Sequence, residues 1–240
     1  MLMRNETANH SNYQDLLKFL AIIAMTIDHI GLYFFPEMTV FRIIGRYAMP
    51  IFCFFAGYNF KGSINFLMIF LGVVLYSITT IFVFGGYFLE TNILIPIFLG
   101  QCYLYLFQNH FKNFNIGYLH FVFIASLWPF TAAVFDYGSL PIAFMIVGYM
   151  SKVKSINLKL AAFLISFISI FHSLLNFVLV NGLDIIFLLI CVLLCFLSIS
   201  VGGFSRNINF NIKIISRYSI FIYFFQVVII GLVWRYYVIS

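Results

Sequence analysis

Charged residues are scarce in this sequence. Only 8% of its 240 residues are Asp, Glu, Lys or Arg, whereas 64% are hydrophobic. A soluble domain has about a quarter of its residues charged, and this chain has too few to cover a water-exposed surface around its 33 Phe and 15 Tyr. The composition excludes a soluble globular protein. It predicts an all-α integral membrane protein in a lipid bilayer, because helices satisfy their own backbone hydrogen bonds there.

Cysteine is also rare, and the four present are not paired in sequence. Cys53, Cys102, Cys191 and Cys195 lie inside apolar runs and form no CxxC motif, so we expect neither a disulfide framework nor a metal site. The 13 Lys and Arg are scattered in small groups without a dense basic block or a nucleic-acid motif. We therefore expect no nucleic-acid partner.

Long apolar runs, in contrast, are abundant. A membrane-spanning helix needs about 20 mostly apolar residues. After a polar N-terminal tail, residues 1–14, this rule predicts an uncleaved first span and a single membrane domain over residues 15–240. We predict about nine transmembrane helices, at residues 15–35, 41–60, 64–84, 92–107, 117–135, 138–150, 158–180, 183–200 and 214–236.

The distribution of basic residues predicts the orientation of these spans, because cytoplasmic loops carry an excess of Lys and Arg. With nine spans and the N-terminus inside, the outer side holds only Arg42, Arg46 and Arg235. The inner segments hold the other ten, which are Arg4, Lys18, Lys61, Lys112, Lys152, Lys154, Lys159, Arg206, Lys213 and Arg217.

Ionisable residues inside two of the predicted spans are the main functional signal, since each costs about 2.5–3.5 kcal/mol on insertion. The first span carries Asp28 and His29, and the second begins with Arg42 and Arg46. Lys18 and His29 are eleven residues apart, which puts them on one helix face about 16 Å apart. If the connecting turn lies near residue 38, His29 and Arg46 meet at similar depth.

Asp28 and His29 are adjacent, so their side chains diverge by about 100° and do not bond within the helix. We expect Asp28 to pair with Arg42 or Arg46 and so to hold the two helices in register. Pro50 predicts a kink in the second span. The whole constellation has two interpretations: a buried ion-pair network without chemistry, or a reaction site in which His29 accepts a proton as a general base.

Two segments resemble a known family. The run KFLAIIAMTIDHIGLYFFP, followed by FRIIGRYAMPIFCFFAG, resembles the TraX family and also the broader acyltransferase family 3, whose first helix carries Arg or Lys, ten residues and then His. Lys18 and His29 have that spacing, and Arg46, Pro50 and Gly57 match the second helix. Near the end, SRYSIFIYFFQ is similar to the last conserved helix, with Gln226 where many members have His.

The resemblance implies a bacterial inner-membrane enzyme that transfers an acetyl group from acetyl-CoA to an amine or hydroxyl of an acceptor. TraX members are linked to N-terminal acetylation of pilin, so the acceptor is a pilin-like protein or a cell-surface glycan. We expect His29, Asp28 and Arg46 to be catalytic, with Arg46 stabilising the oxyanion. The cofactor phosphates would be bound by the cations Lys18, Arg42, Lys61 and Arg217, together with Lys213.

Two other functions are open from the sequence. A proton-coupled transporter or flippase would use Asp28, His29 and the arginines to relay protons or bind an anion. However, the two halves show no paired broken helices, the usual trace of transporter repeats. A non-catalytic membrane scaffold would explain the apolar composition, but not a His and two Arg at one depth.

Overall fold

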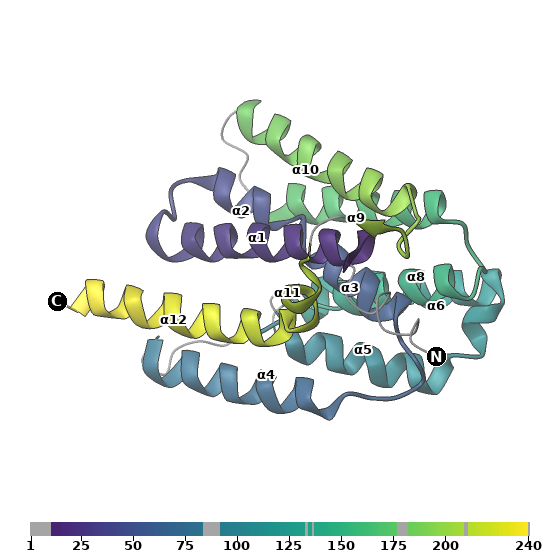
Figure 1. Cartoon of the computed structure of the whole chain (residues 1–240), viewed down its shortest axis with the longest axis horizontal. Helices are drawn as coiled ribbons and strands as arrows, with labels where there is room; N and C mark the ends of the chain where they lie inside the picture. The colour runs from purple at the N-terminus through teal and green to yellow at the C-terminus, as the bar shows by residue number, and fades with distance from the viewer. Residues whose placement is uncertain are drawn as a thin grey trace, which may run out of the picture.

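The structure is a computed structural model that describes residues 11–83, 92–132, 134–135, 137–176, 182–208 and 211–239. Over these residues the chain forms a bundle of α-helices, most of which run along one common direction (Figure 1). The predicted all-α class is therefore confirmed. Most of the predicted polar tail, residues 1–10, lies outside the described residues.

The first helix, α1 (Tyr13–Phe34), is one continuous element of 22 residues. Its start is fixed by a capping box, in which the Asn12 side chain accepts a hydrogen bond from the Asp15 backbone N–H at 2.9 Å. The Asp15 carboxylate accepts one in return from the Asn12 backbone N–H at 3.0 Å. An uninterrupted α1 is what allows residues eleven positions apart to share a face.

A short strand pair, which the apolar pattern did not predict, ties the start of α1 to the last part of the chain. Strand β1 (Ser11–Asn12) pairs antiparallel with β2 (Asn207–Ile208). Beyond β2, the Ile212 backbone N–H donates to the Ser11 hydroxyl at 2.7 Å. The short helix α11 (Lys213–Arg217) is thereby packed against α1, which brings its basic residues to the N-terminal end of α1.

The second predicted span is divided into α2 (Thr39–Gly45) and α3 (Ala48–Tyr58). Arg46 and Tyr47 lie between the two helices. Pro50 follows Arg46 by four residues, and a proline cannot bond to the carbonyl four residues earlier, with which its ring also collides. The interruption falls where Pro50 predicts it.

The other predicted segments are also helical where the structure describes them. The helices are α4 (Phe66–Ile78) with the π-turn η1 (Thr79–Val83), α5 (Leu94–Phe107), the 3-10 turn η2 (His110–Lys112), α6 (Phe114–Ser126), α7 (Trp128–Thr131), α8 (Leu140–Lys152), α9 (Leu158–Asn176), α10 (Gly182–Ser200) and α12 (Ser219–Ile239). Two of the predicted segments are divided, however: the predicted span 117–135 falls into α6 and α7, and the span 214–236 falls into α11 and α12.

Three helical stretches among the described residues are long and apolar enough to cross a bilayer: Tyr13–Phe34, Thr39–Tyr58 and Ser219–Tyr237. The other apolar helices contribute shorter apolar stretches, such as Leu158–His172 in α9 and Leu188–Ser200 in α10. The outer faces of the bundle carry large exposed apolar side chains, among them Phe70, Leu119, Phe167, Leu193 and Phe225. Such a surface is suited to contact with acyl chains, so the chain is a membrane protein. Nine spans and an inward N-terminus stay predictions.

Helix α8 is at the centre of the packing, where it contacts α3, α5, α6 and α9 (Figure 1). Nearly all of its side chains are buried. It approaches α3 so closely that a Cβ at Gly57 would overlap the Met145 carbonyl, and a Cβ at Gly148 would overlap the Phe54 carbonyl. Small residues at such crossings are what permit close backbone approach in membrane bundles.

Enlarging Gly148 is expected to disrupt the bundle. In Gly148→Leu the new side chain meets backbone of α3, which cannot move aside, so the free energy of unfolding should fall by about 3 kcal/mol or more. Thermal unfolding in detergent, followed by size-exclusion chromatography, measures this. The matched control is Val122→Leu on the exposed face of α6, which should unfold as the wild type does. Equal stability of both variants would contradict the tight α3–α8 contact.

Candidate functional site

A cavity of about 660 Å³ runs along the inner face of α1. This volume lies within the range of pockets that bind small molecules and cofactors. Its walls come from α1, α3, α4, α5, α11 and α12 and from the segment between α3 and α4. In α1, Lys18, Met25 and His29 face the cavity at spacings of seven and four residues, which lie on one side of a helix. The predicted shared face of Lys18 and His29 is therefore present.

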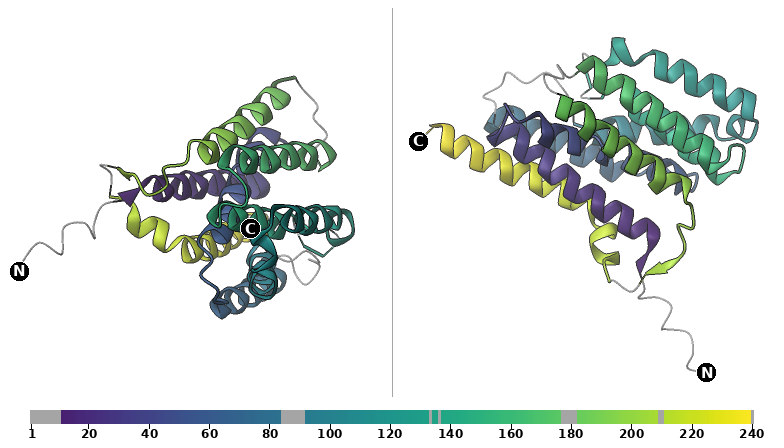
Figure 2. Two further views of the ribbon diagram at one scale, coloured as in Figure 1. Left: turned by 90° about the vertical axis from the view of Figure 1, so that its right-hand side faces the viewer. Right: turned by 90° about the horizontal axis from the view of Figure 1, so that it is seen from above.

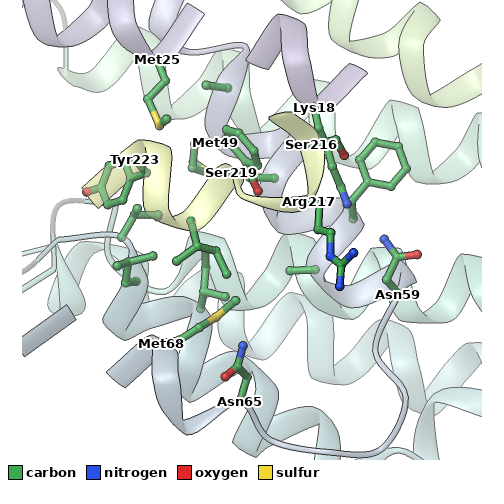
Figure 3. Close-up of a pocket in the computed structure, with 18 of the residues that line it drawn as sticks. Lys18, Met25, Met49, Asn59, Asn65, Met68, Ser216, Arg217, Ser219 and Tyr223 are labelled. Carbon is green, nitrogen blue, oxygen red and sulfur yellow. The ribbon is translucent and has the colours of Figure 1, made fainter. Parts of the chain in front are cut away.

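One end of the cavity is cationic. Lys18 from α1 and Lys213 and Arg217 from α11 line it where α11 packs on α1, and Lys61 lines it from the segment after α3. In the close-up, Lys18, Ser216 and Arg217 gather together, and Arg217 extends toward Asn59 (Figure 3). The Lys18 ammonium also lies 5.9 Å from the centre of the Phe55 ring. Three segments distant in sequence thus contribute positive charge to one opening.

The other end holds the His29 imidazole in mostly apolar surroundings. The Tyr223 ring of α12 lies 5.9 Å from the imidazole, centre to centre. Met25 and Tyr223 lie on the far side of the cavity from Arg217 (Figure 3), and Met49 also contributes to the wall. From Lys18 to His29 the rise along α1 is about 16 Å. The cavity therefore connects a charged opening to an imidazole three helical turns away.

His29 is held by a polar contact that sequence reasoning missed. The Gln226 amide nitrogen on α12 lies 3.0 Å from His29 Nδ1. The Gln226 amide oxygen lies 2.9 Å from Thr26 Oγ1, one turn before His29. In the sequence the signal was a glutamine within a strongly apolar helix. The packing of α12 along α1 is visible in Figures 1 and 2.

Asp28 lies beside His29 in sequence but bonds to a different group. Its carboxylate accepts from the Arg42 guanidinium at 2.9 Å, so the predicted pairing with one of the two arginines is present. A Cβ at Gly45 would overlap the Asp28 carboxyl group, so a glycine there leaves room for the pair. Asp28 and Gly45 touch the cavity, but Arg42 is not among its lining residues in the described part of the chain. Arg42 is therefore placed to neutralise Asp28 rather than to bind a cofactor.

Arg46 is also absent from the described lining of the cavity. Its guanidinium stacks on the Tyr137 ring at 5.1 Å, and Tyr137 is itself a wall residue. The His172 ring packs against Tyr137 at 5.8 Å and against Trp128 at 5.2 Å. Arg46 thus packs on a wall residue and is not itself part of the described lining. That Arg46 and His29 lie at similar depth stays a prediction.

The described residues offer no candidate metal site. Across the described ranges, no three His, Cys, Asp or Glu side chains are grouped so that they could hold a metal ion. The four cysteines are free thiols, and Cys53, Cys191 and Cys195 are buried. The chemistry available in the described lining of the cavity is therefore that of one imidazole, several cations, the carboxylates of Asp15 and Asp28, and neutral polar groups.

Comparison with known proteins shows the relationships of the chain. The family profile described as "TraX protein" matches residues 13–234. A Rickettsia prowazekii (strain Madrid E) protein named "Uncharacterized protein RP591" is 45% identical over 236 residues, which cover 95% of this chain and 94% of that protein. No solved structure matches the chain. The matched range includes every residue of the cavity.

Proposed function

Because the chain belongs to the TraX family, we propose that it is a membrane acetyltransferase that moves an acetyl group from acetyl-CoA to an amine or hydroxyl of an acceptor. The observation that carries this proposal is the cavity, which joins a cationic opening at Lys18 and Arg217 to the imidazole of His29. Acetyl-CoA has the matching chemistry: several phosphate charges at one end and a neutral thioester at the end of a long arm.

In this proposal the phosphates bind at the opening. Lys18, Lys213 and Arg217 supply charge-assisted hydrogen bonds, and the guanidinium can bind phosphate oxygens in a bidentate manner. Lys61, in the segment after α3, adds a fourth positive charge to the lining. The pantetheine arm then extends past Met49 and Met68 toward His29. With the N-terminus inside, as the charge pattern predicts, this opening faces the cytoplasm, where acetyl-CoA is made.

The reaction itself needs one proton acceptor at the deep end. The amine nitrogen or hydroxyl oxygen of the acceptor bonds to the thioester carbonyl carbon. At the same time His29 takes the proton from that attacking group. The carbon–sulfur bond then breaks, and the CoA thiolate leaves and takes up that proton. General-base assistance of this kind contributes typically 10²–10⁴ in rate. The mostly apolar wall keeps water from competing with the acceptor.

The other predicted site residues have supporting parts in this proposal. The Asp28–Arg42 pair cancels charge beside the imidazole and joins α1 to α2. Arg46 holds Tyr137 in the cavity wall through its stacking contact, so we assign it a positioning role instead of oxyanion binding. The acceptor enters at the imidazole end. Family membership favours the N-terminus of a pilin-like protein, with a surface glycan as the second class.

The experiment uses the purified protein in liposomes with radiolabelled acetyl-CoA and two amphiphilic acceptors. One acceptor is a short lipid-soluble peptide with a free N-terminus, and the other is octyl glucoside. We expect label on one of them and stoichiometric release of CoA thiol. No transfer to either acceptor, and no protein-dependent thiol release in a membrane extract, would refute the acetyltransferase. Proton flux driven by a pH gradient without acetyl-CoA would support a transporter instead.

Removing one cation at the opening is expected to weaken cofactor binding without slowing the reaction. Arg217→Gln should raise KM for acetyl-CoA about fivefold, which corresponds to about 1 kcal/mol for an exposed charge contact, and leave kcat unchanged. Steady-state kinetics at two salt concentrations measure this, and the effect should shrink at high salt. The control is Lys159→Gln, an exposed lysine outside the cavity lining. An equal rise in both variants would show that bulk charge, not this opening, binds the cofactor.

A further inference from the structure

Gln226 and Thr26 form a chain of polar contacts that ends on His29. Gln226 on α12 bridges two residues of α1, with one carboxamide atom 3.0 Å from His29 Nδ1 and the other 2.9 Å from Thr26 Oγ1. The Thr26 hydroxyl also lies 2.9 Å from the Ile22 carbonyl oxygen, one turn earlier. The chain therefore runs from a backbone carbonyl through a hydroxyl and a carboxamide to an imidazole.

The number of hydrogens available for these contacts decides the orientation of the Gln226 carboxamide. Thr26 Oγ1 carries one hydrogen. With the Gln226 oxygen facing Thr26, that one hydrogen has two acceptors at the same distance, the Gln226 oxygen and the Ile22 carbonyl oxygen. One of these two contacts then lacks a hydrogen, which is costly for polar groups in a membrane interior.

Turning the Gln226 carboxamide by 180° exchanges its oxygen and nitrogen without changing its shape. Each contact then has one hydrogen. The Thr26 hydroxyl donates to the Ile22 carbonyl, the Gln226 amide N–H donates to Thr26 Oγ1, and His29 Nδ1–H donates to the Gln226 oxygen. In this arrangement each of the three contacts from Ile22 to His29 has its hydrogen, and the His29 ring also has a hydrogen bond with the Met25 backbone.

The two orientations give His29 opposite chemistry. When the amide nitrogen faces Nδ1, the neutral ring carries its hydrogen on Nε2 and has no free lone pair there. When the amide oxygen faces Nδ1, the hydrogen is on Nδ1 and Nε2 is free to accept a proton. The bond made by one ring nitrogen thus sets the function of the other.

We propose that Gln226, held in place by Thr26, is a positioning residue that fixes His29 in the Nδ1–H tautomer and so makes Nε2 the base. The assignment of Nε2 as base rests on the proposed acetyltransferase function, but the tautomer itself does not. Gln226 takes the part that a carboxylate or a backbone carbonyl has beside many other functional histidines. A neutral carboxamide does so without adding a charge next to the Asp28–Arg42 pair.

The test reads the tautomer directly, by nitrogen-15 NMR of the full-length protein in nanodiscs with nitrogen-15-labelled histidine. The His29 signals are assigned as those that disappear in His29→Gln. In the wild type we expect a protonated Nδ1 and an unprotonated Nε2. In Gln226→Leu, which removes both polar atoms, the pattern should shift toward a hydrogen on Nε2. In Gln226→Glu, an ionised side chain that only accepts, the Nδ1–H pattern should persist.

Thr26 provides a second, independent pair of variants. Thr26→Val keeps the shape but loses the hydroxyl, so we expect a mixture of both tautomers, whereas Thr26→Ser should restore the wild-type pattern. In kinetics, Gln226→Leu should lower kcat about tenfold with KM for acetyl-CoA unchanged, and Gln226→Glu should recover most of kcat.

The outcomes separate this inference from the proposed function. A wild-type spectrum with the hydrogen on Nε2, or a spectrum that neither Gln226→Leu nor Thr26→Val changes, would overturn the positioning role. A wild-type spectrum with Nδ1–H that shifts in these variants supports it even if no acetyl transfer is found, in which case only the acetyltransferase proposal fails.

Discussion

Replacing His29 with Gln is expected to reduce kcat for acetyl transfer by a factor of about 10²–10⁴, the usual contribution of a general base. The affinity for CoA should stay within about twofold of the wild type, because the cations at the opening are three helical turns away. Glutamine keeps a polar side chain of similar length but cannot accept a proton at neutral pH. Label transfer in liposomes measures kcat, and equilibrium dialysis with labelled CoA measures the affinity.

The control for this prediction is His110→Gln, because His110 is exposed and lies outside the cavity lining. Its contact is with the His120 ring, whose nitrogen is 3.1 Å away. This variant should keep full activity. If His29→Gln and His110→Gln transferred acetyl groups at the same rate, the imidazole at the deep end would have no part in the reaction, and a binding or transport role for the cavity would be the better explanation.

The second large effect is expected at the ion pair between α1 and α2. Arg42→Gln removes the guanidinium that lies 2.9 Å from the buried Asp28 carboxylate. Removing one partner of a buried pair costs about 3–5 kcal/mol, because the remaining charge loses that compensation. We expect the free energy of unfolding to fall by about 3 kcal/mol, measured as a lower thermal midpoint in detergent at neutral pH.

A double variant provides the decisive comparison. Asp28→Asn together with Arg42→Gln removes both charges, so no unpaired charge is left and the loss of stability should be clearly smaller than in Arg42→Gln alone. Arg217→Gln, at an exposed position, is the single-charge control and should be close to wild type in stability. If the loss of unfolding free energy in the double variant equalled the sum of the two single losses, Asp28 and Arg42 would contribute to stability independently.

The relation between Lys18 and His29 could be predicted from the sequence because it depends only on local geometry. Both residues belong to α1, one unbroken helix, and eleven residues are close to three full turns. The apolar runs likewise predicted where helices occur, since period and length are local properties. Asp28 was predicted to pair with Arg42 or Arg46, and the packing of α2 on α1 brings Arg42 to 2.9 Å from its carboxylate.

Other parts of the site depend on contacts that no local pattern contains. Gln226 and His29 are 197 residues apart, and only the packing of α12 along α1 brings them together. The basic residues of α11 reach Lys18 because a two-residue strand pair closes the start of the chain on its last part, a feature too short to have a sequence signature. Arg46 was predicted to lie on a continuous second helix. In the structure this helix is interrupted before Pro50, and Arg46 is not part of the described cavity lining.

The most direct test of the central claim, that one cavity brings acetyl-CoA from the cationic opening to His29, is photolabelling with a diazirine-bearing acyl-CoA. Mass spectrometry of the labelled protein in liposomes identifies the modified residues. The prediction is label on the residues around the imidazole, Met25, Met49 and Tyr223, that unlabelled CoA suppresses and that Arg217→Gln weakens. Label confined to lipid-facing positions such as Phe70 or Phe225, or label that CoA does not displace, would contradict it.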